Sequence, residues 1–192
     1  MLQLGFLASH RGSNMQAVID ACTEGRLNAK PAVIISNKSK SGAGERAKRE
    51  EIPFYHLSSR THPGPAALDT AILDTLLHHE VDLVILVGYM KKIGPKTLAR
   101  YRGKILNIHP ALLPKFGGKG MYGPRVHEAV LASGEKETGV TIHLVDGKYD
   151  AGPIVAQTRV PVFKEDTVES LARRVLDREH TFLVETLQKF KS

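Results

Sequence analysis

Lys104-Ile105-Leu106-Asn107-Ile108-His109-Pro110 is the stretch from which both the fold and the chemistry of this chain can be worked out. Its apolar residues predict a buried strand over residues 104–108. Side chains alternate along a strand, so Asn107 and His109 should emerge on the same side. Pro110 cannot donate to a sheet ladder and directs the chain out of the sheet. The stretch therefore presents an amide and an imidazole together where a strand ends.

The end of a strand in an open α/β sheet is the rim at which ligands bind. There an amide such as Asn107 can hold a developing oxyanion, and an imidazole such as His109 can move a proton. The other interpretation is structural: a histidine in a turn, beside an asparagine that caps it. The stretch alone leaves both interpretations open.

The N-terminal part of the chain predicts a strand, a polar loop and a helix. The strand covers Leu2–Ala8, and the loop contains Gly12, Ser13 and Asn14. A helix start offers free N–H groups and a positive dipole end, so this loop is a candidate phosphate site. Alternatively, Ser13 or Asn14 only caps the helix. Neither the spaced-glycine dinucleotide fingerprint nor the Walker pattern is present.

The remaining chain alternates between strand and helix patterns. We expect strands over residues 31–36, 53–57, 82–87, 138–145 and 154–162, and helices over 43–51, around 68–77, over 95–102, over 126–132 and towards the C-terminus. Asp166, with Glu169 three residues later, resembles a capping box for the last helix. This order predicts one α/β domain over 1–192, with a doubly wound, mostly parallel sheet. Helices should cover both faces, with some antiparallel pairing towards the C-terminal portion.

Composition narrows the class of protein. The 192 residues carry a net charge of +7 and a single cysteine, Cys22, so no internal disulfide can form. No apolar run reaches the length of a membrane span, and residues 1–5 do not resemble a secretory signal, which favours a cytoplasmic protein. The positive charge is scattered and lacks interleaved aromatics, so small anionic ligands explain it as well as nucleic acid does.

A carboxylate would orient the imidazole of His109 and stabilise its charged form. Two candidates follow the strand over 138–145. Asp146 precedes Gly147, so turn formation explains it, whereas Asp150 lies before Ala-Gly-Pro and has no comparable structural duty. We prefer Asp150, although it could also serve only to shape its loop. Spacing alone does not decide between these interpretations.

Several motifs together resemble the folate-dependent formyltransferases. The motifs are Asn107-Ile108-His109-Pro110, Leu112-Leu113-Pro114, Gly139-Val140-Thr141-Ile142-His143-Leu144-Val145 and Asp150-Ala151-Gly152-Pro153. Gly12-Ser13-Asn14 and Glu179-His180 are similar to those members of the family that act on phosphoribosylglycinamide. The resemblance covers nearly the whole chain, and it implies the formyltransferase fold.

The resemblance also implies a reaction. A formyl group would pass from the co-substrate 10-formyltetrahydrofolate to the amine of 5-phosphoribosylglycinamide, giving the N-formyl product and tetrahydrofolate in de novo purine (IMP) biosynthesis. Asn107, His109 and Asp150 would be the catalytic residues. Asn107 would donate to the developing oxyanion, and His109 would stabilise it or shuttle protons. Asp150 would hold His109 and could organise a water.

Binding roles follow from the same resemblance. Gly12, Ser13 and Asn14 would hold the phosphate, and Glu179 would contact the ribose hydroxyls or the substrate amine. The folate would be bound through Met90, Lys91, Lys92 and Ile93, with Asn107, Val145 and the loop over 146–150 completing the pterin pocket. His143 would be a structural strand residue, and the glycine-rich loop over 117–123 a wall or lid of the site. No metal is implied.

This chain departs from the family pattern near the folate's glutamate tail. Some relatives carry an arginine at the start of the third helix, where this chain has residues 63–67 as Pro-Gly-Pro-Ala-Ala. Arg60, His62 or Lys91 could replace that arginine. Lys92 stands where an apolar residue is common.

Three other functions were weighed. Methionyl-tRNA formyltransferase and formyltetrahydrofolate deformylase share the chemistry but carry an added domain, for which we expect no room in this chain. A non-catalytic nucleotide-binding module would make Asn107, His109 and Asp150 incidental. We expect small-molecule partners rather than nucleic acid or membrane, and the sequence leaves both a monomer and a homodimer open.

Overall fold

The computed structural model describes residues 1–190 and contains one seven-stranded sheet. Its spatial order is β3-β2-β1-β4-β5-β6-β7. The first five of these strands are parallel to one another, whereas β6 pairs antiparallel with both β5 and β7. The strands are β1 (Leu2–Ala8), β2 (Ala29–Ser36), β3 (Phe54–His56), β4 (Leu83–Leu86), β5 (Ile105–His109), β6 (Glu137–Leu144) and β7 (Ile154–Pro161). The predicted fold class, including the antiparallel C-terminal portion, is confirmed.

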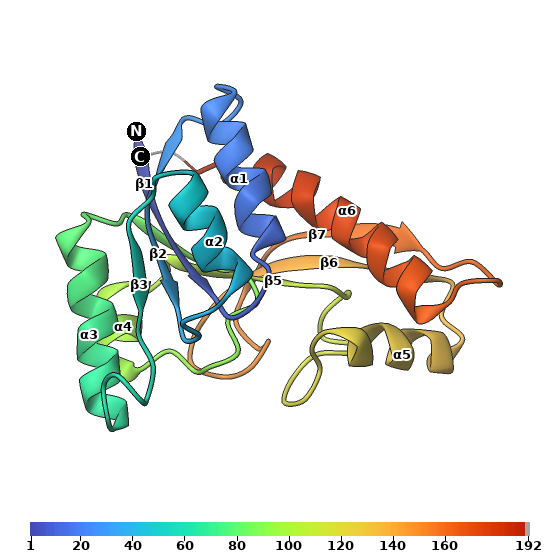
Figure 1. Ribbon diagram of the computed structural model, residues 1–192. Helices are drawn as coiled ribbons and strands as arrows, with labels where there is room; N and C mark the ends of the chain where they lie inside the picture. The colour runs from blue at the N-terminus through green and yellow to red at the C-terminus, as the bar shows by residue number, and fades with distance from the viewer. Residues whose placement is uncertain (191–192) are drawn as a thin grey trace.

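Helices cover both faces of this sheet (Figure 1). Helices α1, α2 and α6 pack on one face and share a core that includes Phe6, Val18 and Leu183. Helices α3 and α4 lie on the other face, over a second core that includes Leu7 and Leu76. The helices are α1 (Ser13–Thr23), α2 (Gly42–Arg49), α3 (Pro65–His78), α4 (Pro95–Arg100), α5 (Pro124–Ser133) and α6 (Val168–Leu187). None of the helices within residues 1–190 is long and apolar enough to span a membrane.

The start of α6 differs from the sequence prediction by one residue. Thr167 is the N-cap, and it forms the capping box with Ser170 rather than with Glu169. Asp166 is instead engaged by the guanidinium of Arg174, with both N–O distances 2.7 Å. The prediction that Asp166 and Glu169 form the box was wrong: Thr167 caps the helix, and the Asp166 carboxylate accepts from Arg174 and from Oγ of Ser170 instead.

The sheet order places a topological switch point at β1. The chain runs from β1 outward to β2 and β3, then returns to add β4 on the other side of β1. The loops that leave β1 and β4 therefore diverge from adjacent C-terminal strand ends, which creates a crevice suited to ligands. Residues 9–14 follow β1, residues 87–94 follow β4, and β5 ends beside them at His109.

Candidate active site

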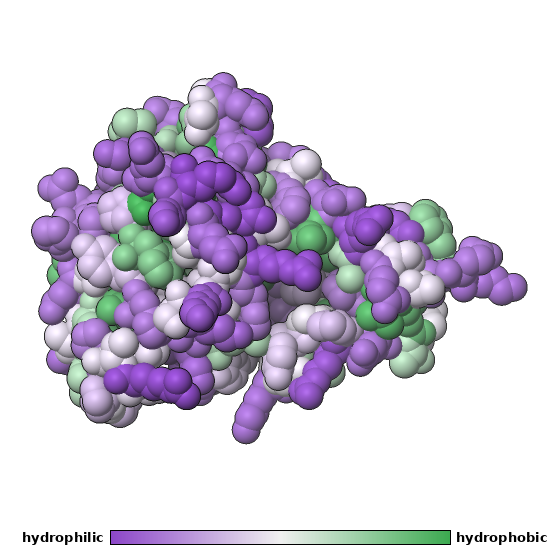
Figure 2. Space-filling view, in the orientation of Figure 1, coloured by the Kyte–Doolittle hydropathy of each residue, from purple (hydrophilic) through white to green (hydrophobic). Residues whose placement is uncertain are grey.

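One cavity of about 760 Å³ lies at the C-terminal ends of β1, β4 and β5. Figure 2 shows a hollow near the middle of one face, surrounded mainly by hydrophilic residues. The structure brings most of the site residues expected from sequence to this cavity. Among its lining residues are Gly12, Ser13, Asn14, Met90, Asn107, His109, Asp150 and Glu179.

Asn107 is held by a residue of the neighbouring strand. β5 and β6 pair antiparallel with Asn107 directly opposite His143. The Nδ2 group of Asn107 donates to Nε2 of His143 at 3.0 Å and lies 3.5 Å from Oδ1 of Asp150. Nδ1 of His143 donates to the carbonyl of Leu144 at 2.9 Å, so Nε2 is the ring nitrogen that accepts from Asn107. His143 thereby fixes Asn107 with its NH₂ group towards Asp150.

His109 is buried, with 4% of its surface exposed. Its Nε2 donates to the carbonyl of Phe116 at 2.8 Å, and its Nδ1 lies 3.6 Å from Oδ2 of Asp150. Burial lowers the pKa of His109, although Asp150 and the Phe116 carbonyl act in the opposite direction. At neutral pH the ring is therefore mostly neutral, and Nδ1 can take a proton beside a carboxylate that stabilises the resulting cation.

Asp150 connects the two histidines with the glycine-rich loop. Its Oδ1 lies 3.5 Å from Nε2 of His143, and its Oδ2 accepts from the Gly118 N–H at 2.9 Å. Burial raises the pKa of Asp150, but His143, His109 and the Gly118 N–H outweigh it and hold the pKa below its usual range. The carboxylate therefore holds the glycine-rich loop and also faces His109. Asp146, as expected, only makes a turn, accepting from the Lys148 N–H at 3.0 Å.

The loop after β1 leaves the start of α1 free to bind a ligand. Gly12 is the N-cap in a left-handed conformation (φ 69°), and no side chain caps the helix. The interpretation that Ser13 or Asn14 merely caps this helix is therefore wrong. Asn14 instead donates from Nδ2 to Glu179 at 3.3 Å, and its Oδ1 is buried without a partner among the described residues. The backbone N–H groups at this helix start thus lie at the cavity without a side-chain cap, next to a buried and unpaired amide oxygen.

Glu179 is a buried carboxyl on the cavity wall. Burial raises its pKa to about 7, while the hydrogen bond from Asn14 acts in the opposite direction. A carboxyl whose pKa is higher in the folded than in the unfolded state stabilises the fold below the unfolded value, and this contribution is lost as the pH rises through the folded value. The window here runs from about pH 4.5 to about 7.

Glu179→Gln should therefore become more stable relative to the parent chain as the pH rises. Between pH 5 and 8 we expect the difference in unfolding free energy to grow by about 2–3 kcal/mol, in favour of the variant. Urea unfolding at both pH values measures it. Glu185→Gln on the same helix is the contrast: the hydrogen bond from Arg178 lowers the pKa of that carboxyl, so its window lies below pH 4.5 and its difference should stay nearly constant between pH 5 and 8. An unchanged difference for Glu179→Gln would contradict the buried-carboxyl interpretation.

A second, smaller pocket of about 70 Å³ adjoins the main cavity and shares Asn107, Tyr149 and Asp150 with it. Three of the residues expected at the folate site, Lys91, Lys92 and Ile93, line this pocket, and Met90 lines the main cavity instead. Val145 and Leu86 complete its apolar wall. The unusual Lys92 lies with Nζ 5.1 Å from the ring centre of Tyr149. An apolar slot ending at an amide and a carboxylate suits a flat heterocycle with polar edges.

Some residues of the main cavity were not found from sequence. Arg11 and Arg125 add positive charge to its lining. Tyr149, by contrast, belongs to the loop over 146–150 that was expected at the pterin pocket, and it lines both pockets. His127 on α5 is not among the lining residues: it is buried, its Nδ1 has no partner among the described residues, and burial and then His109 lower its pKa. Arg11 directly precedes Gly12 in the sequence, and this position could have indicated that Arg11 lies at the cavity. The place of His127 depends on how α5 packs, which no local pattern reveals.

The described residues contain no group of three or more His, Cys, Asp or Glu side chains arranged to hold a metal ion. The functional groups that the cavity does present are an amide, an imidazole and a carboxylate at the end of β5, with a free helix start opposite them. Such a site can polarise a carbonyl, accept a proton and bind an anion, as group transfer to an amine requires.

Comparison with known proteins identifies the family to which this chain belongs. The model of the formyl transferase family matches residues 2–187, so this chain belongs to that family. It is 43% identical over 187 residues to phosphoribosylglycinamide formyltransferase, chloroplastic, of Vigna unguiculata, which covers 97% of this chain and 60% of that protein. It is 40% identical to phosphoribosylglycinamide formyltransferase of Haemophilus influenzae, covering 94% of this chain and 82% of the relative.

A solved structure agrees with the sequence relatives. The crystal structure of phosphoribosylglycinamide formyltransferase from Bacillus halodurans superposes with a TM-score of 0.90 at 37% identity, covering 97% of this chain and 94% of the other. The two chains therefore share one fold over nearly their whole lengths. The chain spans less than two thirds of the plant relative's length.

Proposed function

We propose that this chain transfers a formyl group from 10-formyltetrahydrofolate to the amine of 5-phosphoribosylglycinamide, a step of de novo purine biosynthesis. The observation that carries the proposal is one cavity in which the free N-terminus of α1 faces Asn107, His109 and Asp150. An acceptor with a phosphate at one end and an amine at the other would span this cavity. The adjoining apolar slot would hold the formyl donor, because it opens onto the same Asn107 and Asp150.

The proposed mechanism uses three side chains. As the amine attacks the formyl carbon and a C–N bond forms, the carbonyl oxygen gains negative charge, and Nδ2 of Asn107 donates to it. His109 takes the proton that the amine loses, at Nδ1. Asp150, 3.6 Å away, stabilises the imidazolium. When the bond between the carbon and the folate nitrogen breaks, the proton is returned to that leaving nitrogen.

The acceptor would be held at both ends. Its phosphate would accept from the backbone N–H groups at Ser13 and Asn14, with Arg11 adding charge. Its hydroxyls or amine would meet Glu179 and the unpaired Oδ1 of Asn14. Because the pKa of Glu179 is about 7, the KM for the acceptor should fall as the pH rises through 7 if the charged carboxylate is the binding form.

A formyl-transfer assay with 10-formyltetrahydrofolate tests the proposal. With phosphoribosylglycinamide present, we expect the N-formyl product and tetrahydrofolate in equal amounts. Without an amine, little formate should appear. Formate released at a similar rate without the acceptor would indicate a deformylase, and no product in either assay would exclude formyl-transfer chemistry.

Gly12→Ala tests the phosphate loop. A Cβ at Gly12 would lie 3.1 Å from Cβ of Ala43, and the left-handed backbone disfavours it by roughly 1–2 kcal/mol. We expect the KM for phosphoribosylglycinamide to rise about tenfold or more, the loss of roughly one hydrogen bond to a charged group. The control is Gly25→Ala, whose φ of +72° imposes the same backbone strain with no atom within 4 Å. Equal KM values in the two variants would argue against phosphate binding at this loop.

A further inference from the structure

The loop between β1 and α1, residues 10–14, keeps its shape without a side-chain cap on the helix. We call it the phosphate loop. Gly12 holds a left-handed backbone there, and glycine is the residue whose backbone is least restricted by itself. The conformation of the phosphate loop therefore needs support from a neighbouring element. That element is α2, which lies beside α1 and is hydrogen-bonded to it (Figure 1).

The first turn of α2 packs directly against the phosphate loop. The Ala43 N–H donates to the carbonyl of His10 at 3.0 Å. A Cβ at Gly42 would lie only 3.0 Å from Cα of Arg11, so the two backbones approach about as closely as a glycine allows. The path of the phosphate loop is thus set by the place where α2 begins.

The half-buried side chain of Arg46, one turn further along α2, holds the chain on both sides of Gly12. Its Nε donates to the carbonyl of Arg11 at 2.9 Å, and its Nη1 donates to Oε1 of Gln16 at 3.1 Å. Within residues 1–190, no carboxylate forms an ion pair with Arg46. The guanidinium is therefore bound to the phosphate loop and to α1 rather than neutralised by an acid.

These hydrogen bonds determine where two N–H groups of the phosphate loop point. A trans peptide is planar, so its N–H points away from its own carbonyl. Because the carbonyls of His10 and Arg11 point to α2, the N–H groups of Arg11 and Gly12 point away from α2. Neither of them donates to a carbonyl within residues 1–190, and both residues line the main cavity. Successive N–H groups that point the same way form an anion-binding backbone.

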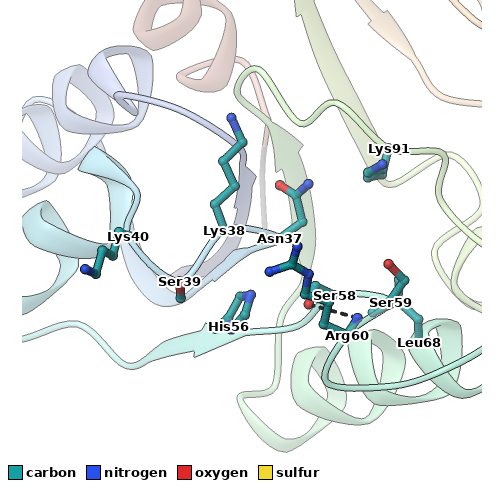
Figure 3. A pocket seen from close by; sticks show the side chains of 10 residues that line it. All are labelled: Asn37, Lys38, Ser39, Lys40, His56, Ser58, Ser59, Arg60, Leu68 and Lys91. Carbon is teal, nitrogen blue, oxygen red and sulfur yellow. Dashed lines mark hydrogen bonds between the residues drawn. The ribbon is translucent and has the colours of Figure 1, made fainter.

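Other cations near the start of α2 belong to a different cavity. Lys38 and Lys40, on the loop before α2, line a separate cavity of about 530 Å³ at the ends of β2 and β3 (Figure 3). Arg60 and Lys91 line it as well, whereas His62 and Arg46 do not. The contacts of Arg46 thus assign it to the phosphate loop and not to this cluster of cations.

We propose that Arg46 is a positioning residue for the phosphate of the acceptor. By holding the carbonyl of Arg11, it orients the Gly12 N–H, which donates to the phosphate together with the N–H groups of Ser13 and Asn14. This rests on the proposed function. Arg46 itself does not touch the substrate in this proposal, and its effect is confined to acceptor binding.

The test compares Arg46→Met with Arg46→Gln. Methionine removes the donors and the charge at similar length, whereas Nε2 of glutamine lies as far along the side chain as Nε of arginine and keeps one uncharged donor. We expect Arg46→Met to raise the KM for phosphoribosylglycinamide about three- to tenfold, the effect of one hydrogen bond. The kcat and the KM for 10-formyltetrahydrofolate should stay near the parent values. Arg46→Gln should recover most of the loss.

An acceptor without a phosphate separates positioning from general structural damage. Ribosylglycinamide offers the same amine and ribose but no phosphate, so its kcat/KM should be equal in the parent chain and in Arg46→Met. Inorganic phosphate, competing with phosphoribosylglycinamide, should inhibit Arg46→Met with an inhibition constant raised by the same factor as the KM. A merely structural role would lower kcat/KM for both acceptors alike.

Arg49→Met is the matched control. Arg49 lies on the same helix, carries the same charge and donates to the same Oε1 of Gln16 at 2.7 Å, but its other hydrogen bond goes to Glu50. Its removal should leave the KM for phosphoribosylglycinamide near the parent value. An equal rise of KM in the Arg46 and Arg49 variants would mean that only positive charge on α2 matters.

Gly42→Ala reaches the phosphate loop through the backbone, in case Arg46→Met does not fold. The added Cβ would press on Arg11, so the KM for phosphoribosylglycinamide should rise while ribosylglycinamide is used as before. Gly44→Ala is its control, because a Cβ there would lie 2.9 Å from the ring of Phe54 and not at the phosphate loop. The same change of KM in both glycine variants would count against a specific effect of α2 on the phosphate loop.

The outcomes distinguish two failures. An unchanged KM in Arg46→Met, an equal loss with both acceptors, or a loss that Arg46→Gln does not reduce would overturn the positioning role of Arg46. Transfer by the parent chain would leave the proposed function standing in each of these cases. Equal KM values of the parent chain for the two acceptors would also overturn it, since no phosphate would then be recognised. Absence of transfer by the parent chain would instead reject the proposed function.

Discussion

His109→Gln is expected to lower kcat for formyl transfer by about 10²–10⁴, the usual range for the loss of a positioned general base. Nδ1 of His109 is the atom able to take the amine's proton, because Nε2 already donates to the Phe116 carbonyl at 2.8 Å. Glutamine can keep a donor towards that carbonyl, but its amide cannot accept a proton at neutral pH. The lost step should therefore be the proton transfer rather than the shape of the loop.

The control for His109→Gln is ligand binding. Calorimetric titration with phosphoribosylglycinamide should give a Kd close to that of the parent chain, and the melting temperature should change little. A non-catalytic nucleotide-binding module predicts instead that any measured activity survives the substitution. Full turnover in His109→Gln would thus remove this residue from the mechanism, whereas loss of both binding and fold would call for His109→Asn as a smaller change.

The pH dependence of kcat should follow from the protonation states of His109 and Asp150. Burial lowers the pKa of His109, and the neighbours of Asp150 hold the pKa of Asp150 low. At neutral pH we therefore expect a neutral imidazole, able to take a proton, beside an ionised carboxylate. Activity should fall on acidification as His109 becomes protonated. Since the two groups interact, the pH profile reports the pair rather than either residue alone.

The sequence was sufficient for the order of elements because periodicity reflects burial. The strand β5 is apolar and ends at Pro110, and Gly12 precedes a helix whose buried residues recur at helical spacing. The helix start of α6 was placed one residue early because Asp166 and Thr167 are both good N-caps. In the structure Thr167 caps the helix, while Asp166 accepts from Ser170 and Arg174 of the same helix, and the sequence pattern did not distinguish these two roles.

The contacts within the candidate site could not be predicted, because they depend on which strands pair and in which register, and no single segment of the sequence determines this. Asn107 and His143 meet because β6 pairs antiparallel with β5 in one register, and 36 residues separate them. His143 was expected to be only a structural strand residue, yet it holds both Asn107 and Asp150. Asp150 turns towards His109 from a left-handed backbone (φ 50°), a conformation that its sequence neighbours did not reveal.

Asn107→Ala is expected to lower kcat by about 10²–10³, the typical cost of removing one oxyanion donor. The KM values for both substrates should change much less, because this donor is needed mainly when charge develops on the formyl oxygen. His143→Leu should lower kcat as well, since it removes the acceptor that holds the Asn107 NH₂ group in place. His143→Gln should recover part of this loss, because its amide oxygen can accept the same hydrogen bond.

A double-mutant cycle then distinguishes positioning from general structural damage. If His143 acts through Asn107, adding His143→Leu to Asn107→Ala should cost little further kcat, although each single change is costly. If His143 instead supports the site independently, for example by holding Asp150 at 3.5 Å, the two losses should multiply. Multiplying losses, with no recovery in His143→Gln, would mean that Asn107 does not depend on its neighbour across β5 and β6. Strongly non-additive losses would make the Asn107–His143 pair one functional unit.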